Sequence, residues 1–109
     1  MSNLVQKKSF AVSSQGENTI LSPRSSNGKL MIYSVIYNPN ADITGEVQIK
    51  LGSEIKSGAR NPKTGAIYGF NDHPNFILGG TGESLIVVLP SATAVTVDVA
   101  WREAPDYNV

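Results

Sequence analysis

Cysteine is absent from the 109-residue chain, and histidine and tryptophan occur once each. Without cysteine, disulfide scaffolds, zinc–thiolate sites and thiol catalysis are excluded. A metal site on the single histidine, His73, would need further histidines or suitably spaced carboxylates, and neither is nearby in the sequence. A Ser-His-Asp centre would have to be assembled from scattered loops. We therefore expect no metal, no other cofactor and no enzymatic activity.

Charge is also scarce. Charged side chains make up 17% of the residues, below the usual level of about 25%, and nine basic and nine acidic residues give a formal net charge of zero. A nucleic-acid-binding protein normally has a basic surplus, so we expect no nucleic-acid partner. Low charge gives little electrostatic protection against self-association, and we expect other protein to cover part of this surface.

Long hydrophobic stretches are missing too. The longest apolar run, Leu85–Leu89, has five residues, whereas a membrane-spanning helix needs about 20. At the start of the chain, Met1–Lys8 has only a very short apolar stretch, unlike a signal peptide. The sequence predicts no membrane partner and synthesis in a cytoplasm.

Most of the chain that remains has the hydrophobic pattern of short strands. Val95, Val97, Val99 and Trp101 alternate with polar or small residues, which is typical of a strand with one face in a core. Eight segments have strand character, namely Val5–Val12, Asn18–Leu21, Lys29–Tyr37, Glu46–Leu51, Ala66–Phe70, Phe76–Leu78, Ser84–Leu89 and Val95–Arg102.

Turn residues separate these segments. Asn-Pro, Gly-rich and Pro-Ser sequences favour chain reversals at Asn38–Asp42, Asn61–Gly65, Asp72–Asn75, Gly79–Gly82 and Pro90–Ala92, the last closing a hairpin. About eight short strands spaced in this way predict an all-β, single antiparallel β-sandwich domain or small barrel over residues 1–109. Residues 1–15 are expected to be an arm or edge strand, and residues 104–109 a tail.

The candidate interaction residues lie on the longest strand. Lys29–Tyr37 is apolar on both faces, with Met31, Tyr33, Val35 and Tyr37 on one of them. One interpretation is an interface with another subunit or partner, since Tyr and Met are enriched in interfaces. The other is that the same chain covers this face, for example with its N-terminal arm.

Other motifs favour structural roles. His73 precedes Pro74 in a predicted loop, and Gly79–Gly82 leads into a strand rather than the helix that a phosphate-binding loop requires. The acidic residues are spread singly, without the pairing of a glycosidase. Trp101 continues the inward face of its strand, which predicts burial.

The order of segments resembles a known class of proteins. A long apolar strand, Gly28–Asn38, is followed by Glu46–Leu51, by Tyr68-Gly69-Phe70, by Gly79–Leu89 and by Thr93–Glu103. This order is similar to that of small β-sandwich virion proteins of tailed bacteriophages, particularly jelly-roll capsid decoration (cement) proteins. The resemblance covers roughly Gly28–Glu103.

The resemblance implies a structural function. A protein of this class would bind the outside of the capsid and stabilise contacts between major capsid subunits, acting as a homodimer or homotrimer on the virion surface. From the residues alone, jelly-roll and immunoglobulin-like strand orders stay open. An alternative function is a carbohydrate-binding β-sandwich module, which requires Tyr or Trp side chains exposed on a groove or platform.

Overall fold

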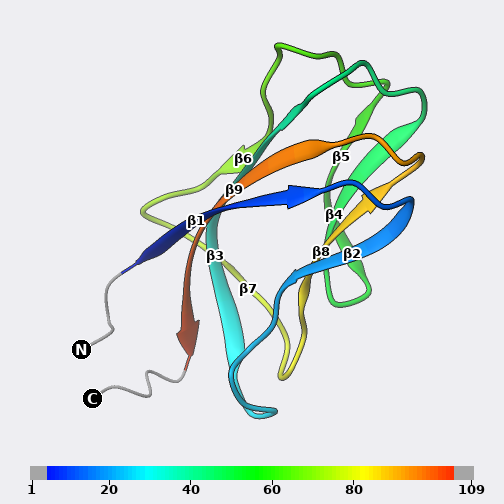
Figure 1. The fold of residues 1–109 in the computed structure, drawn as a ribbon. Helices are drawn as coiled ribbons and strands as arrows, with labels where there is room; N and C mark the ends of the chain where they lie inside the picture. Colours follow the sequence, from blue (N-terminus) through cyan, green and yellow to red (C-terminus); the bar gives the residue numbers. More distant parts are fainter. Residues whose placement is uncertain (1–4, 105–109) are drawn as a thin grey trace.

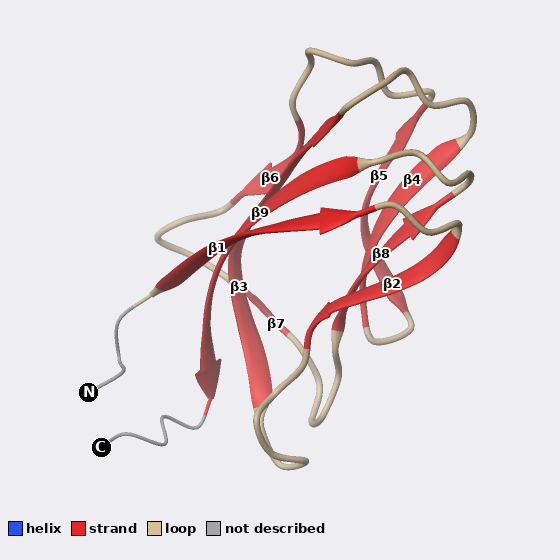
Figure 2. Cartoon of the chain, in the orientation of Figure 1, coloured by secondary structure: helices blue, strands red, loops and turns tan. Residues whose placement is uncertain are grey.

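The computed structural model describes residues 5–104, and in this range every regular element is a strand (Figures 1 and 2). Two antiparallel sheets pack face to face, as the sequence predicted. The nine strands are β1 (Gln6–Val12), β2 (Gly16–Leu21), β3 (Lys29–Pro39), β4 (Glu46–Leu51), β5 (Glu54–Arg60), β6 (Tyr68–Asn71), β7 (Ile77–Leu78), β8 (Leu85–Leu89) and β9 (Val95–Ala104).

The chain passes repeatedly from one sheet to the other. The first sheet has the order β1-β9-β3-β6, with β7 also paired to β3, and the second has the order β2-β8-β4-β5. Among the described strands, only β4 and β5 are consecutive and directly paired. The expected hairpin at Pro90–Ala92 is wrong, because this turn joins β8 and β9, which lie in different sheets. The turn residues predict a reversal but not which sheet receives the next strand.

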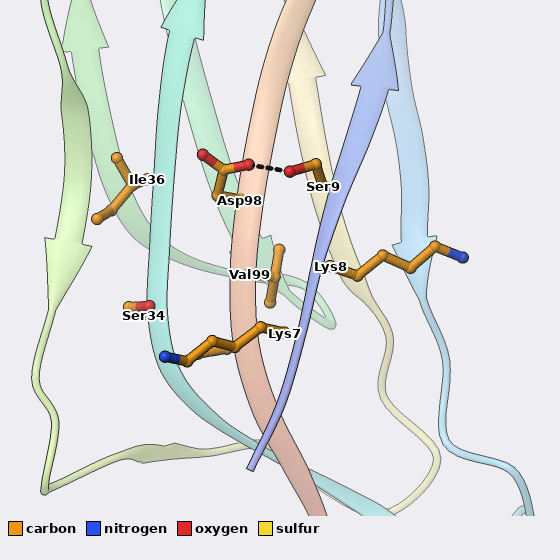
Figure 3. A pocket seen from close by; sticks show the side chains of 8 residues that line it. Lys7, Lys8, Ser9, Ser34, Ile36, Asp98 and Val99 are labelled. Atoms are coloured by element: carbon orange, nitrogen blue, oxygen red, sulfur yellow. Dashed lines mark hydrogen bonds between the residues drawn. The ribbon is translucent and has the colours of Figure 1, made fainter.

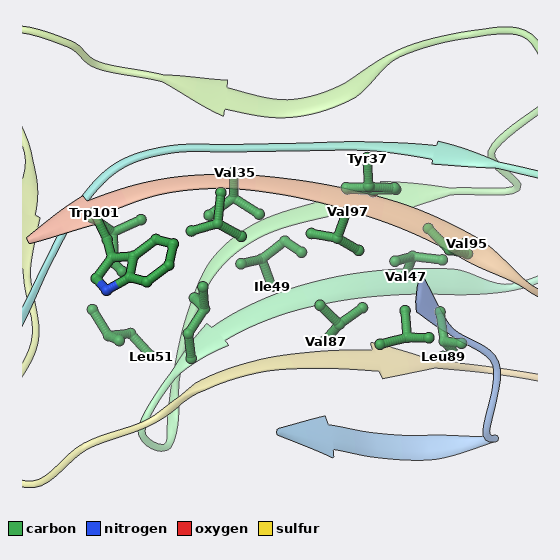
Figure 4. Close-up of a cluster of buried hydrophobic side chains, with 14 of the residues drawn as sticks. Val35, Tyr37, Val47, Ile49, Leu51, Val87, Leu89, Val95, Val97 and Trp101 are labelled. Carbon is green, nitrogen blue, oxygen red and sulfur yellow. The ribbon is translucent and has the colours of Figure 1, made fainter. Parts of the chain in front are cut away.

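The core lies between the sheets and consists largely of alternating branched side chains (Figure 4). Val95, Val97 and Val99 of β9 face inward, with Thr96 and Asp98 exposed between them. Trp101 continues this inward row at the end of the cluster and is buried, as its strand pattern predicted. Burial of such side chains, at about 25 cal/mol per Å² of apolar area, is the main force that holds the two sheets together.

Strand β5 was not among the eight predicted segments. It contains only two apolar residues in seven, Ile55 and Ala59, and lies at an edge of its sheet. A register shift against β4 between Ile49 and Lys50 interrupts its alternation further. An exposed edge strand needs no continuous apolar face, so its sequence resembles that of a loop.

Candidate functional site

A β-bulge in β3 decides where the four candidate interface residues lie. The pairing of β3 with β9 shifts between Ile32 and Ser34, so that Tyr33 is an extra residue without a partner on β9. Such a bulge reverses the inward and outward positions of the residues that follow. Leu30 and Ile32 face the core before it, and Val35 and Tyr37 face the core after it.

The prediction that Met31, Tyr33, Val35 and Tyr37 share one face is therefore wrong. Val35 and Tyr37 are in the core, and Tyr33 is buried outside that cluster by the chain's own loop. Met31 is half-buried on the outer face of the first sheet. The single chain thus covers three of the four side chains, and only Met31 remains available for a partner.

Tyr37 is the largest of the fully buried side chains, with 1% of its surface exposed. Its ring stacks on that of Tyr68 with 5.6 Å between the centroids, and its hydroxyl has no hydrogen-bond partner among the described residues. Burial, together with the nearby Tyr68 and Glu46, raises the pKa of Tyr37 from its ordinary value of 10.0 to about 12. This hydroxyl stays protonated and belongs to the core.

Tyr33 lies on the other side of the sheet, under the loop that joins β6 to β7. Its carbonyl accepts a hydrogen bond from the Asp72 amide at 2.8 Å. The centroid of its ring lies 5.2 Å from that of the His73 ring and 5.5 Å from that of the Phe76 ring. Arg102 donates to its hydroxyl from Nη1 at 3.4 Å. The bulge thus anchors a loop that carries His73 and Phe76 over the outer face.

An apolar patch remains exposed beside this loop, formed by Met31, Phe76 and Leu78 and called here the Met31 patch. Leu78 is directly opposite Met31 in the sheet and is 50% exposed, and Phe76 is 42% exposed. Arg102 is opposite Met31 on its other side, on β9. Aromatic, Met and Arg side chains are enriched in protein interfaces, and this patch combines all three.

The outer face of the first sheet is hollowed along strands β1, β9 and β3 and near the end of β6. Three adjoining depressions of about 510 to 580 Å³ form one groove on this face. The middle depression shares Lys7, Ser34 and Ala100 with one neighbour. It shares Ile36 and Asp98 with the other. Figure 3 shows the middle depression, where Ser9 of β1 donates a hydrogen bond to Asp98 of β9. Small side chains such as Ser9, Ser34 and Ala100 contribute to this hollow, because they fill little space on the face of the sheet.

This groove lacks the aromatic platform that sugar binding by stacking requires. Of the Tyr and Trp side chains in residues 5–104, Tyr33, Tyr37 and Trp101 are buried and Tyr68 is half-buried. Tyr107 lies outside the described residues. The carbohydrate-binding alternative therefore has no supporting side chain in this groove.

The remaining candidates are in ordinary structural settings. His73 is in an exposed loop before Pro74, and Gly79–Gly82 forms a turn that leads to a strand. In this turn the Glu83 carboxylate accepts a hydrogen bond from the Gly80 amide at 2.7 Å. No group of three or more metal-binding side chains occurs within residues 5–104. The same range contains no helix long and apolar enough to cross a membrane.

The chain matches no protein-family model, and no curated protein sequence matches it significantly.

Proposed function

We propose that the protein is a structural virion component that binds the outside of a phage capsid and stabilises contacts between major capsid subunits. The observation that carries this proposal is the Met31 patch, in which two large apolar side chains are about half exposed beside Arg102. In a chain with few charges, such a patch favours docking on another protein. Its occupant in this proposal is the capsid surface.

The strand order supports the resemblance on which the proposal draws. Both β6 and β7 pair with β3, to Ser34–Tyr37 and to Met31–Ile32 respectively. When they are counted as one interrupted strand, the sandwich has eight strands in two four-stranded sheets, and the chain alternates between the sheets at most connections. Eight strands in a double sheet is the architecture of a jelly roll, and we include that order in the proposal.

Stabilisation of the capsid would follow from mass action. A site composed of two neighbouring capsid subunits exists only in the assembled shell, so binding to it favours assembly over dissociation. A dimer or trimer of the protein would bind several such sites at once and gain avidity. A homodimer or homotrimer is therefore part of the proposal.

The proposal is tested by sedimenting the purified protein with capsids of the parent phage that lack it. We expect saturable binding and a higher temperature of capsid disruption. Leu78→Ser should weaken binding by about tenfold, because it removes an apolar group from the centre of the contact.

Ile55→Ser is the matched control, since Ile55 is 54% exposed but lies on the other sheet. It should leave binding unchanged. Absence of saturable binding by the unmodified protein, with no gain in capsid stability, would refute the function. Equal weakening by the two variants would reject the Met31 patch as the docking site.

A further inference from the structure

The polar side chains at one end of the groove include a lysine and several groups that can donate hydrogen bonds. This end is lined by Val5, Lys7, Ser34, Asn71, His73 and Ala100, and we call it the Lys7 pocket. None of these six residues is acidic. Its volume of about 520 Å³ leaves room for a side chain of another molecule.

The sheet register brings the polar groups together from strands far apart in the sequence. Lys7 of β1 is opposite Ala100 of β9, Ala100 is opposite Ser34 of β3, and Ser34 is opposite Asn71 of β6. Because Ala100 is small, the Lys7 side chain can lie across β9, and Figure 3 shows its nitrogen reaching toward Ser34. His73 follows two residues after Asn71, on the loop that Tyr33 anchors.

The donors of this pocket have no partners among the residues that the structure describes. Among residues 5–104, no carboxylate lies within ion-pair distance of Lys7, and the Ser34 hydroxyl has no hydrogen-bond partner. The Asn71 side-chain oxygen accepts a hydrogen bond from the His73 amide at 3.1 Å, which leaves the Asn71 amide nitrogen as a donor. A cation with uncharged donors around it is suited to an anion.

Other charges surround the pocket without filling it. Asp98 lies two residues before Ala100 on β9, outside the pocket, and accepts a hydrogen bond from Ser9. Asp72 is exposed on the loop, where its backbone amide bonds to Tyr33, and its side chain does not line the pocket. Arg102 lies two residues after Ala100 on β9 and donates a hydrogen bond to the Tyr33 hydroxyl. It therefore adds positive charge on the side of the pocket nearest Tyr33.

We propose that the Lys7 pocket binds a carboxylate, supplied by an Asp or Glu side chain of the protein that docks on the Met31 patch. This inference rests on the proposed function. The two features adjoin at Tyr33, whose ring contacts both His73 of the pocket and Phe76 of the patch. The partner segment therefore has an apolar side chain for the patch and an acidic residue close to it.

The pocket is tested first without any capsid. Isotope-labelled protein is titrated with sodium acetate, against sodium chloride at the same ionic strength, and the amide signals of Ser34, Asn71 and His73 are followed by NMR. We expect saturable shifts of these signals with acetate and none with chloride. Lys7→Gln should weaken acetate binding two- to fivefold.

Lys8→Gln is the matched control. Lys8 is the next residue on the same strand, but its ammonium group lies 5.3 Å from the Phe10 ring and its side chain points away from Lys7 (Figure 3). It should bind acetate as the unmodified protein does. Absence of saturable shifts, or equal weakening by the two variants, would overturn the proposal.

The capsid assay then identifies the source of the carboxylate and separates the two proposals. Lys7→Gln should reduce capsid binding while Lys8→Gln does not. Capsid binding that is insensitive to Lys7→Gln would reject the pocket as part of the contact and leave the proposed function standing. Acetate binding without any capsid binding would reject the proposed function and the capsid as the source, and would leave only a site for small carboxylates.

Discussion

Tyr37 illustrates how a single buried polar atom affects stability. Its hydroxyl is enclosed in the core without a hydrogen-bond partner among the described residues, whereas the Tyr68 hydroxyl accepts a hydrogen bond from the Lys63 amide at 2.7 Å. An unsatisfied buried group costs stability, and a satisfied one contributes about 1 kcal/mol. Tyr37→Phe should thus leave the free energy of unfolding unchanged or raise it by up to about 1 kcal/mol near neutral pH, measured by urea denaturation.

Tyr68→Phe is the control and should lower the free energy of unfolding by about 0.5–1.5 kcal/mol. A loss for Tyr37→Phe as large as that for Tyr68→Phe would show that the Tyr37 hydroxyl is satisfied after all.

The same hydroxyl predicts a loss of stability in alkali. The pKa of Tyr37 is about 12 in the folded chain and about 10 in the unfolded chain, so the folded state holds this proton more tightly. This contribution is fully present below about pH 10 and is lost as the pH rises to about 12. Between about pH 8 and pH 11, the unmodified protein should lose about 1 kcal/mol more than Tyr37→Phe does. Equal losses would contradict the raised pKa.

Residue positions could be predicted from the sequence wherever a strand alternates without interruption. Trp101 is an example, since β9 keeps its two-residue period from Val95 to Trp101. Tyr33 is the counterexample: the apolar pattern of β3 continues on both faces through the bulge, so nothing in it marks where the faces exchange. Replacing Tyr33 and Tyr37 by Ser should therefore destabilise the folded chain, because it removes the Tyr37 side chain from the core.

At the scale of elements, Gly69 determines whether β6 can pair with β3. It has a φ of 108° and lies opposite Ile36, and a Cβ added there would be 1.9 Å from the Val35 carbonyl oxygen. Gly69→Ala should therefore lower the free energy of unfolding by about 2–4 kcal/mol and expose the amides of β6 to hydrogen exchange.

Gly65→Ala separates the steric clash from backbone strain. Gly65 also has a positive φ, 83°, but no atom lies within 4 Å of its added Cβ. Its substitution should cost only about 1–2 kcal/mol and leave the exchange of β6 unchanged. Equal effects of the two substitutions would mean that the close approach of β6 to β3 is not important for stability.

The strands differ in how well the sequence predicts them. Central strands such as β8 and β9 have a buried face, and burial selects the apolar side chains by which the sequence predicts these strands. The edge strand β5 is exposed at most positions, and its pairing depends on the turn at Gly52, which has a φ of 65°. Its backbone hydrogen bonds hold it in the sheet without requiring apolar side chains.

At the scale of the molecule, the pairing of distant segments creates the candidate surfaces. The Lys7 pocket draws on β1, β9, β3 and β6, and the Met31 patch joins β3 to β7 and the loop before it. These residues have no common spacing in the sequence, so the surfaces could not be found without the strand order. The sandwich itself could be predicted, because it depends only on local alternation and turns.

The two sheets share a single core, and this predicts cooperative unfolding of the whole molecule. Inward side chains of β3 and β9 contact those of β4 and β8, so neither sheet can keep its apolar face buried after the other has opened. Trp101, at one end of this core, provides a fluorescence probe, and circular dichroism follows the strands. Both signals should change in one transition with the same urea midpoint and a slope of about 1–2 kcal/mol per M. A fluorescence change at a clearly lower urea concentration than the loss of the strand signal would mean that the end of the sandwich near Trp101 unfolds on its own. The Met31 patch, which lies on the same sheet as Trp101, would then belong to a less stable part of the protein.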